Sequence, residues 1–127
     1  MSDFVQLTLD SDADFVLRSI YLVTDTPIAF FSFNYSGPSG YFYSQSLLPS
    51  MVWSFNASEP TPVLPEILYP AGSVIRINIQ NTYNTGIVST VSHSIYFVGV
   101  KRFHTGCEEE YDKRFIYAAI KTYVGRN

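Results

Sequence analysis

The sequence predicts an all-β protein whose body is an antiparallel β-sandwich or a jelly-roll relative. Short segments of alternating apolar and polar residues recur along residues 1–103, and turn residues separate them at regular intervals. No helical pattern of roughly 10–15 residues alternates with these segments, so a parallel sheet with crossover helices is not expected. A chain of 127 residues has the size of one domain and buries enough surface to fold without disulfides.

The first half of the chain contains four expected strands. Residues 4–10 alternate in polarity, which indicates a strand with one buried face. Residues 15–25, FVLRSIYLVTD, are apolar on both faces apart from one Arg-Ser pair. This pattern predicts a central strand that is buried on both sides, or that a neighbouring subunit covers on one side. Residues 28–35 and 41–48 flank the turn SGPSG and are expected to pair as a hairpin.

The second half of the body begins with a proline-rich segment. Residues 58–72 carry four of the chain's seven prolines and predict a long ordered loop across one end of the body. Residues 73–82, SVIRINIQNT, alternate isoleucine with polar residues, which predicts a strand with its isoleucines in the core. Residues 87–103 predict one long or two short strands. Gly99 within them indicates a bulge or a close approach of another backbone.

The C-terminal segment, residues 104–127, differs in character and is expected to form a helix or an extended arm outside the sandwich. Thr105 and Glu108 fit a capping box. Apolar residues recur every four positions, at Tyr111, Phe115, Ala119 and Tyr123. These features predict an amphipathic helix over about residues 107–124, and the strand formers in the same segment make a β arm the alternative.

This arm is expected to cross onto a neighbouring subunit and to bury its four regularly spaced residues there. Tyr111, Phe115, Ala119 and Tyr123 are therefore candidate interface residues. A chain that lacks residues 105–127 is accordingly expected to stay folded and to dissociate more readily.

The composition narrows the classes of partner. Only 15% of the residues are charged, against about 25% in typical domains, while 46% are hydrophobic and 17% aromatic. Either another chain covers part of the surface, or Ser, Thr, Asn and Tyr keep it polar. A net charge of −3 lacks the basic footprint of a nucleic-acid binder. No membrane span or signal peptide is recognisable, so we expect the chain to act in the cytoplasm or in an assembly built there.

No group of residues predicts a catalytic or metal site. His93, His104 and Cys107 are the soft metal ligands, fewer than the four of a structural zinc site. Cys107 and His104 lack an orienting third group, and the pattern places no two carboxylates across a cleft. We therefore expect no enzymatic activity, no cofactor and no metal.

Two other surface features are candidate contact sites. The aromatic run at residues 41–43 and Trp53 would suit a platform for sugar rings, or else these residues belong to the core or to a subunit interface. Lys101 and Arg102 lie together at an expected strand end. They would pair with an acidic patch on a partner, or else they form an ordinary exposed strand end.

Three segments carry a resemblance to a known class of protein. They are DADFVLRSIYLVTDTPIAFFSF near the start, LPEILYPAGSVIRINIQNT in the middle and SIYFVGVKRF at the end of the body. In this order, over residues 4–103, they resemble small virion structural proteins of tailed bacteriophages.

The resemblance implies a non-enzymatic structural role in the virion. The version expected first is a capsid decoration or cement protein that stabilises the phage head through subunit interfaces. Its partners would be copies of itself, in a homo-oligomer, and a major capsid or other virion protein. A head–tail or tail component is the alternative within this class, and a carbohydrate-binding β-sandwich module is the alternative outside it.

Overall fold

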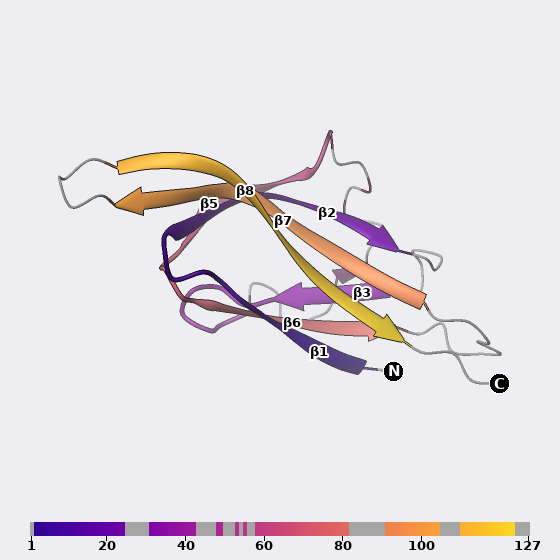
Figure 1. Ribbon diagram of the computed structural model, residues 1–127. Coiled ribbons are helices and arrows are strands. Elements are labelled where there is room, and N and C mark those ends of the chain that lie inside the picture. The colour runs from indigo at the N-terminus through magenta and orange to yellow at the C-terminus, as the bar shows by residue number, and fades with distance from the viewer. Residues whose placement is uncertain are drawn as a thin grey trace.

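The structure is a computed structural model, and it is all β (Figure 1). It describes residues 2–24, 31–42, 48–49, 53, 55, 58–81, 91–104 and 110–123. Within these residues two four-stranded antiparallel sheets pack together as a sandwich-like body. The predicted fold class is therefore confirmed in its main features, apart from the C-terminal segment.

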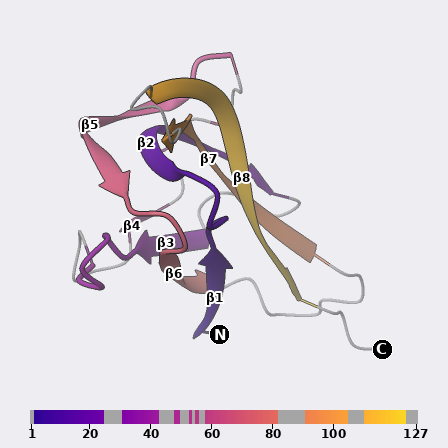
Figure 2. The same cartoon turned by 60° about the vertical axis from the view of Figure 1, so that its left-hand side comes forward.

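Each sheet takes strands from both halves of the chain and so joins distant parts of the sequence. Sheet A has the order β1-β6-β3-β4, and sheet B has the order β5-β2-β7-β8. Sheet A contains β1 (Ser2–Thr8), β6 (Val74–Asn81), β3 (Phe31–Tyr35) and β4 (Leu48–Pro49). Sheet B contains β5 (Thr61–Tyr69), β2 (Asp14–Thr24), β7 (Val91–His104) and β8 (Glu110–Tyr123). Figures 1 and 2 show these sheets as two layers.

The core lies between the sheets, and the alternation of β6 supplies much of it. Ile75, Ile77 and Ile79 are fully or almost fully buried, as their spacing predicts. Aromatic residues fill the remaining space; for example, the rings of Tyr35 on β3 and Phe97 on β7 meet edge to face with centroids 5.7 Å apart. Burying each such side chain contributes roughly 1.5–3 kcal/mol.

The close backbone approach predicted at Gly99 is confirmed. Gly99 lies opposite Leu17, and the pairing of β2 with β7 shifts register between Leu17 and Ser19. This irregularity brings the Val16 carbonyl oxygen to within 1.9 Å of where a Cβ atom on residue 99 would lie. A glycine is required there because any side chain would overlap the backbone of β2.

The predicted C-terminal helix is wrong for the residues that the structure describes there. They form β8, which pairs with β7 from Val91↔Tyr123 to His104↔Glu110. Residues four apart share one face of a strand as well as of a helix, so the spacing of the apolar residues could not separate the two. Strand formers such as Phe115 and Ile116 favour the β conformation, and β7 offers a complete partner. The expected capping box, at residues 105 and 108, lies outside the described residues.

The loop predicted for residues 58–72 is also wrong in its central part. Thr61–Tyr69 form β5, the edge strand of sheet B, which pairs only with β2. An edge strand tolerates proline because one side of it has no strand partner that needs its amide groups. Pro62 and Pro65 therefore fit within β5.

Candidate functional site

The side of sheet B that points away from the core is largely apolar. Strand register places its side chains in rows across the sheet, such as Tyr21 opposite Tyr96 and Tyr96 opposite Ala118. We call this surface the outer face. Its apolar residues are Val16, Tyr21, Val23, Leu68, Tyr96, Val98, Val100, Ile116, Ala118 and Ile120, and Arg18 of β2 and Ser94 of β7 lie among them.

Several large side chains of the outer face are half exposed. The exposed fractions are 49% for Val23, 42% for Ile116, 56% for Ile120 and 48% for Leu68. No strand of the described chain packs over them (Figure 1). The sequence predicted that residues 15–25 would be covered on both sides, and the described chain supplies the cover on one side only.

Sheet A differs from sheet B on its outward side. Of the outward residues of β6, Arg76, Asn78 and Gln80 are polar, and Val74 at its start is apolar and 44% exposed. Phe4 is the large aromatic on this side, and the Arg76 guanidinium lies over its ring at 4.2 Å from the centroid. Antiparallel sheets that face water have this polar outward pattern, so the apolar pattern of sheet B is the exception.

Polar groups border the outer face at both ends. At one end Arg102 pairs with Asp112 at 3.1 Å, and nearer the middle of the face Arg18 of β2 pairs with Glu66 of the edge strand β5 at 3.2 Å. The hydrogen bond from Arg102 lowers the pKa of the Asp112 carboxyl, although partial desolvation opposes the shift. Arg114 is exposed at the same end. At the other end the hydroxyl groups of Ser92 and Thr122 lie 3.1 Å apart.

The candidate contact residue Lys101 points to the inner side of β7 and is buried. Its ammonium contacts carboxylates of its own chain, Asp10 at 2.5 Å and Asp12 at 3.3 Å, and lies over the Phe115 ring at 4.1 Å. Burial disfavours the charge on Lys101, but these hydrogen bonds outweigh it and raise its pKa. The neighbouring Arg102 lies on the opposite side of β7, at the border of the outer face.

The candidate arm residues point inward from β8 in the described part of the chain. Ala119 is buried, and Phe115 packs against the core beside Tyr117, with ring centroids 4.7 Å apart. The side chains of Tyr111 and Tyr123 lie outside the described part. The opposite side of β8, with Ile116 and Ile120, was missed by the sequence reasoning. The period of two in FIYAAIKTY would have indicated this second apolar side of the strand.

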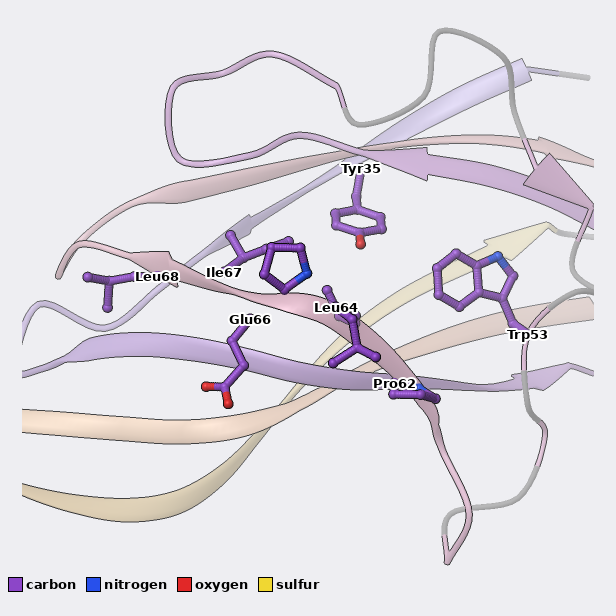
Figure 3. Close-up of a pocket in the computed structure, with 9 residues that line it drawn as sticks. Tyr35, Trp53, Pro62, Leu64, Glu66, Ile67 and Leu68 are labelled. Atoms are coloured by element: carbon purple, nitrogen blue, oxygen red, sulfur yellow. The ribbon is translucent and has the colours of Figure 1, made fainter.

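Trp53 borders a cleft at the side of the sandwich, between β5 and β3 (Figure 3). The cleft has a volume of about 490 Å³, and its walls include Tyr35, Leu64 and Ile67. Figure 3 shows Tyr35 reaching from its strand toward β5, with the Trp53 ring to one side. We call this feature the Trp53 cleft.

The indole of Trp53 packs on Phe33, with centroids 5.2 Å apart. Its Nε1–H group is buried and has no hydrogen-bond partner among the described residues. A buried donor of this kind is suited to an acceptor from a bound molecule. Tyr41 of the predicted aromatic platform is 81% exposed and does not line the cleft, and Tyr43 lies outside the described residues.

The described residues form neither a metal cluster nor a helix that would suit a bilayer. In that part of the chain, no three His, Cys, Asp or Glu side chains come together as they would around a metal ion. Cys107, the one cysteine, is outside it. The same residues include no helix whose length and hydropathy would suit a bilayer span.

Comparison of the chain with protein-family models, with curated proteins and with solved structures finds no match. Its function must therefore be inferred from the outer face and the Trp53 cleft.

Proposed function

We propose that this chain is a non-enzymatic virion structural protein, a decoration or cement protein that stabilises a phage capsid through subunit interfaces. One observation carries the proposal: the outer face of sheet B is apolar, while the outward side of sheet A is polar. A stiff two-sheet body with one adhesive face suits a molecule whose role is to cover surface.

The energetics of the outer face support a covered state. Val23, Ile116, Ile120 and Leu68 each leave close to half of their surface in water. Complete burial of such a side chain is worth roughly 1.5–3 kcal/mol, so covering the exposed halves of four of them recovers several kcal/mol. Only 15% of the chain is charged, which lowers the electrostatic cost of placing it permanently against another protein.

The resemblance of three sequence segments to small virion proteins of tailed bacteriophages supports the same role. The partners are copies of this chain and a major capsid or other virion protein, and assembly takes place in the host cytoplasm. A position at the head–tail junction or in the tail would use the same adhesive surfaces, because what they recognise is a flat protein partner.

The test is the composition and stability of particles made by the genome that encodes the chain. We expect mass spectrometry of purified particles to find the chain in stoichiometric amount, and electron microscopy to place it at regular positions. Particles made without its gene should rupture at a lower temperature than complete particles. Adding the purified protein back should return the rupture temperature to that of complete particles. Absence of the chain from purified particles would contradict the proposal.

The second candidate function is carbohydrate binding in the Trp53 cleft. It is favoured by the buried Nε1–H of Trp53, which has no partner among the described residues, beside the ring of Tyr35. A volume of about 490 Å³ lies within the range of small-molecule sites. Aromatic rings and one donor suit the apolar face and a hydroxyl group of a sugar.

The chain contains one tryptophan, so its intrinsic fluorescence reports on this cleft directly. A glycan array followed by fluorescence titration separates the two functions. Saturable quenching of the wild-type chain by a specific sugar, together with calorimetric binding that is lost in Trp53→Ala but not in Tyr41→Ala, would support the module. If no sugar binds on the array, carbohydrate binding is rejected in favour of the structural role.

A further inference from the structure

We propose that the outer face of sheet B binds a second copy of this chain, forming a two-fold dimer in which two sheets pack face to face. The two-fold axis runs parallel to the strands, between β2 and β7. The proposal deepens the proposed function and rests on it in taking the outer face as a surface that assembly covers.

The strand order defines what this axis brings together. Sheet B has the order β5-β2-β7-β8, so an axis midway between β2 and β7 places β8 of one copy over β5 of the other. The hydroxyl-bearing ends of the two faces then lie together, as do their charged ends. Packed sheets of this kind keep their strands within about 30° of each other, which twisted copies of one sheet satisfy.

The centre of the face is aromatic. Tyr21 on β2 and Tyr96 on β7 are directly opposite in register, and their rings stack with centroids 4.7 Å apart and an interplanar angle of 10°. The proposed axis passes between these two strands, so the tyrosine pair of one copy packs against that of the other. Large aromatic side chains at the centre of an interface are typical of residues that dominate binding energy.

The charged end of the face is complementary to itself across the axis. Arg114 lies on β8, in register with Val100, and forms no ion pair with another described residue. Glu66 lies on β5 and is half exposed even though it pairs with Arg18. The two-fold axis brings Arg114 of each copy toward Glu66 of the other, which supplies two intermolecular ion pairs.

The area is that of a small, reversible interface. The face is four strands wide from Val100 to Phe97, where β5 runs beside β2, and three strands wide from there to Ser92. At about 4.8 Å between strands this gives a projected area of about 450 Å², so two copies bury roughly 900 Å², which is in the range of weak interfaces. A dimer of this kind keeps the Trp53 cleft, which lies between β5 and β3, free for a shell protein.

Two valines provide a matched test. Val23, on the outer face, is 49% exposed, and Val74, on the outward side of sheet A, is 44% exposed. We expect sedimentation equilibrium of the full chain to show a mass about twice 14.4 kDa, with a dissociation constant on the order of micromolar. Val23→Lys should weaken the dimer at least about 100-fold because it buries an unpaired charge, and Val74→Lys should leave it unchanged.

Circular dichroism establishes that each variant is folded, and Ile116→Lys replaces Val23→Lys if the latter is not. Ile116 lies in the row of Val98, Ser19 and Pro62, where β5 of the second copy covers β8. A wild-type chain that stays monomeric at several hundred micromolar overturns the proposal. A dimer that resists both Val23→Lys and Ile116→Lys also overturns it, because the second copy must then bind elsewhere.

Two adjacent residues of β8 test the orientation of the copies. Arg114 is on the outer side of the strand and Lys113 is on the other side, so Arg114→Glu and Lys113→Glu change the net charge equally. We expect Arg114→Glu to weaken the dimer about tenfold by opposing Glu66, and Lys113→Glu to change the affinity less than about twofold. Equal effects of the two changes would overturn the assigned axis.

These outcomes are separate from those of the proposed function. If the wild-type chain is monomeric but is present in purified particles, and the Val23→Lys variant is missing from them, the dimer is refuted and the virion role is retained. If the chain forms the dimer but is absent from particles, the virion role is refuted and the dimer is retained.

Discussion

Gly99 on β7 lies so close to Val16 on β2 that a Cβ atom on Gly99 would be 1.9 Å from the Val16 carbonyl oxygen. The contact coincides with the register shift of β2 between Leu17 and Ser19. Beyond the shift, Ile20 and Leu22 continue the inward side that Phe15 and Leu17 began. The register shift of β2 is therefore possible only because residue 99 is a glycine and has no side chain.

Gly99→Ala is expected to destabilise the protein by about 3 kcal/mol, because the new methyl group overlaps backbone atoms that cannot move without breaking the β2–β7 pairing. The free energy of unfolding in urea measures the effect. Gly72→Ala is the control: Gly72 has a φ of 77° but nothing within 4 Å of a new Cβ, so only about 1 kcal/mol of backbone strain is expected. Equal losses in the two variants would contradict the close approach.

Asp10 and Lys101 predict a pH dependence of stability. The hydrogen bond from Lys101 lowers the pKa of Asp10 below its ordinary 3.8, despite some desolvation. A lowered folded-state pKa means that the stabilisation is complete above pH 3.8 and is lost as the pH falls through the folded value. Asp10→Asn should therefore lower the free energy of unfolding at pH 7, and the difference from wild type should shrink as the pH falls from 3.8 through the lowered folded-state pKa.

The stabilisation that arises from Lys101 depends on pH in the opposite direction. Its raised pKa gives stabilisation that is complete below pH 10.5 and is lost above it. Glu59→Gln serves as the control, since Glu59 forms no ion pair with another described residue. An Asp10→Asn effect that stayed constant from pH 2 to pH 7 would exclude the ion pair as its cause.

Tyr117 on β8 tests whether the last strand belongs to the core. Its ring packs edge to face on Phe15 at 4.8 Å, and its hydroxyl accepts a hydrogen bond from the Asp10 amide. Tyr117→Ala should cost about 3–5 kcal/mol by analogy with other large aromatic truncations, and Ile116→Ala, on the opposite side of the strand, less than about 1.5 kcal/mol. Thermal and urea unfolding provide the comparison.

Because β8 contributes Tyr117 to the core, a chain that ends at residue 104 should lose cooperative unfolding. The sequence alone predicted that such a chain would stay folded and only dissociate more readily. A chain that ends at Tyr123 keeps β8 and is the control. A well-dispersed NMR spectrum from the shorter chain would show that β8 is dispensable.

The Tyr69 hydroxyl donates a buried hydrogen bond to the Ser36 carbonyl, at 2.9 Å, and so links β5 of sheet B to the end of β3 in sheet A. Tyr69→Phe should cost about 1–2 kcal/mol, because the Ser36 carbonyl loses this donor in the interior. Tyr41→Phe removes a hydroxyl from a ring that is 81% exposed and should change the free energy of unfolding by less than about 0.5 kcal/mol. Equal effects would indicate that the buried bond contributes nothing.

The sequence was informative wherever a period of two was clear. The isoleucines of β6 and the glycine of β7 could be interpreted correctly because alternation and close approach are local properties. The segment that became β8 could not, since a four-residue spacing satisfies both a helix and a strand, and only the exposed edge of β7 decides between them.

The contact surfaces were harder to predict for the same reason. Phe115 and Ala119 looked like an adhesive stripe, but pairing with β7 turns them inward and leaves Ile116 and Ile120 outside. Lys101 seemed available to a partner because nothing in the sequence shows that Asp10 and Asp12, about ninety positions earlier, come to meet its ammonium. Long-range pairing determines these outcomes.

Pro62 and Pro65 in β5 have a consequence for how copies of this chain can grow into larger structures. An edge strand of sheet B with a full row of unpaired amide groups could pair with strands of further chains and extend the sheet into a fibre. Pro62 and Pro65 interrupt that row in β5. Continuous lateral growth of sheet B needs both of its edges, so this interruption at β5 disfavours fibres and leaves β8 as the uninterrupted edge.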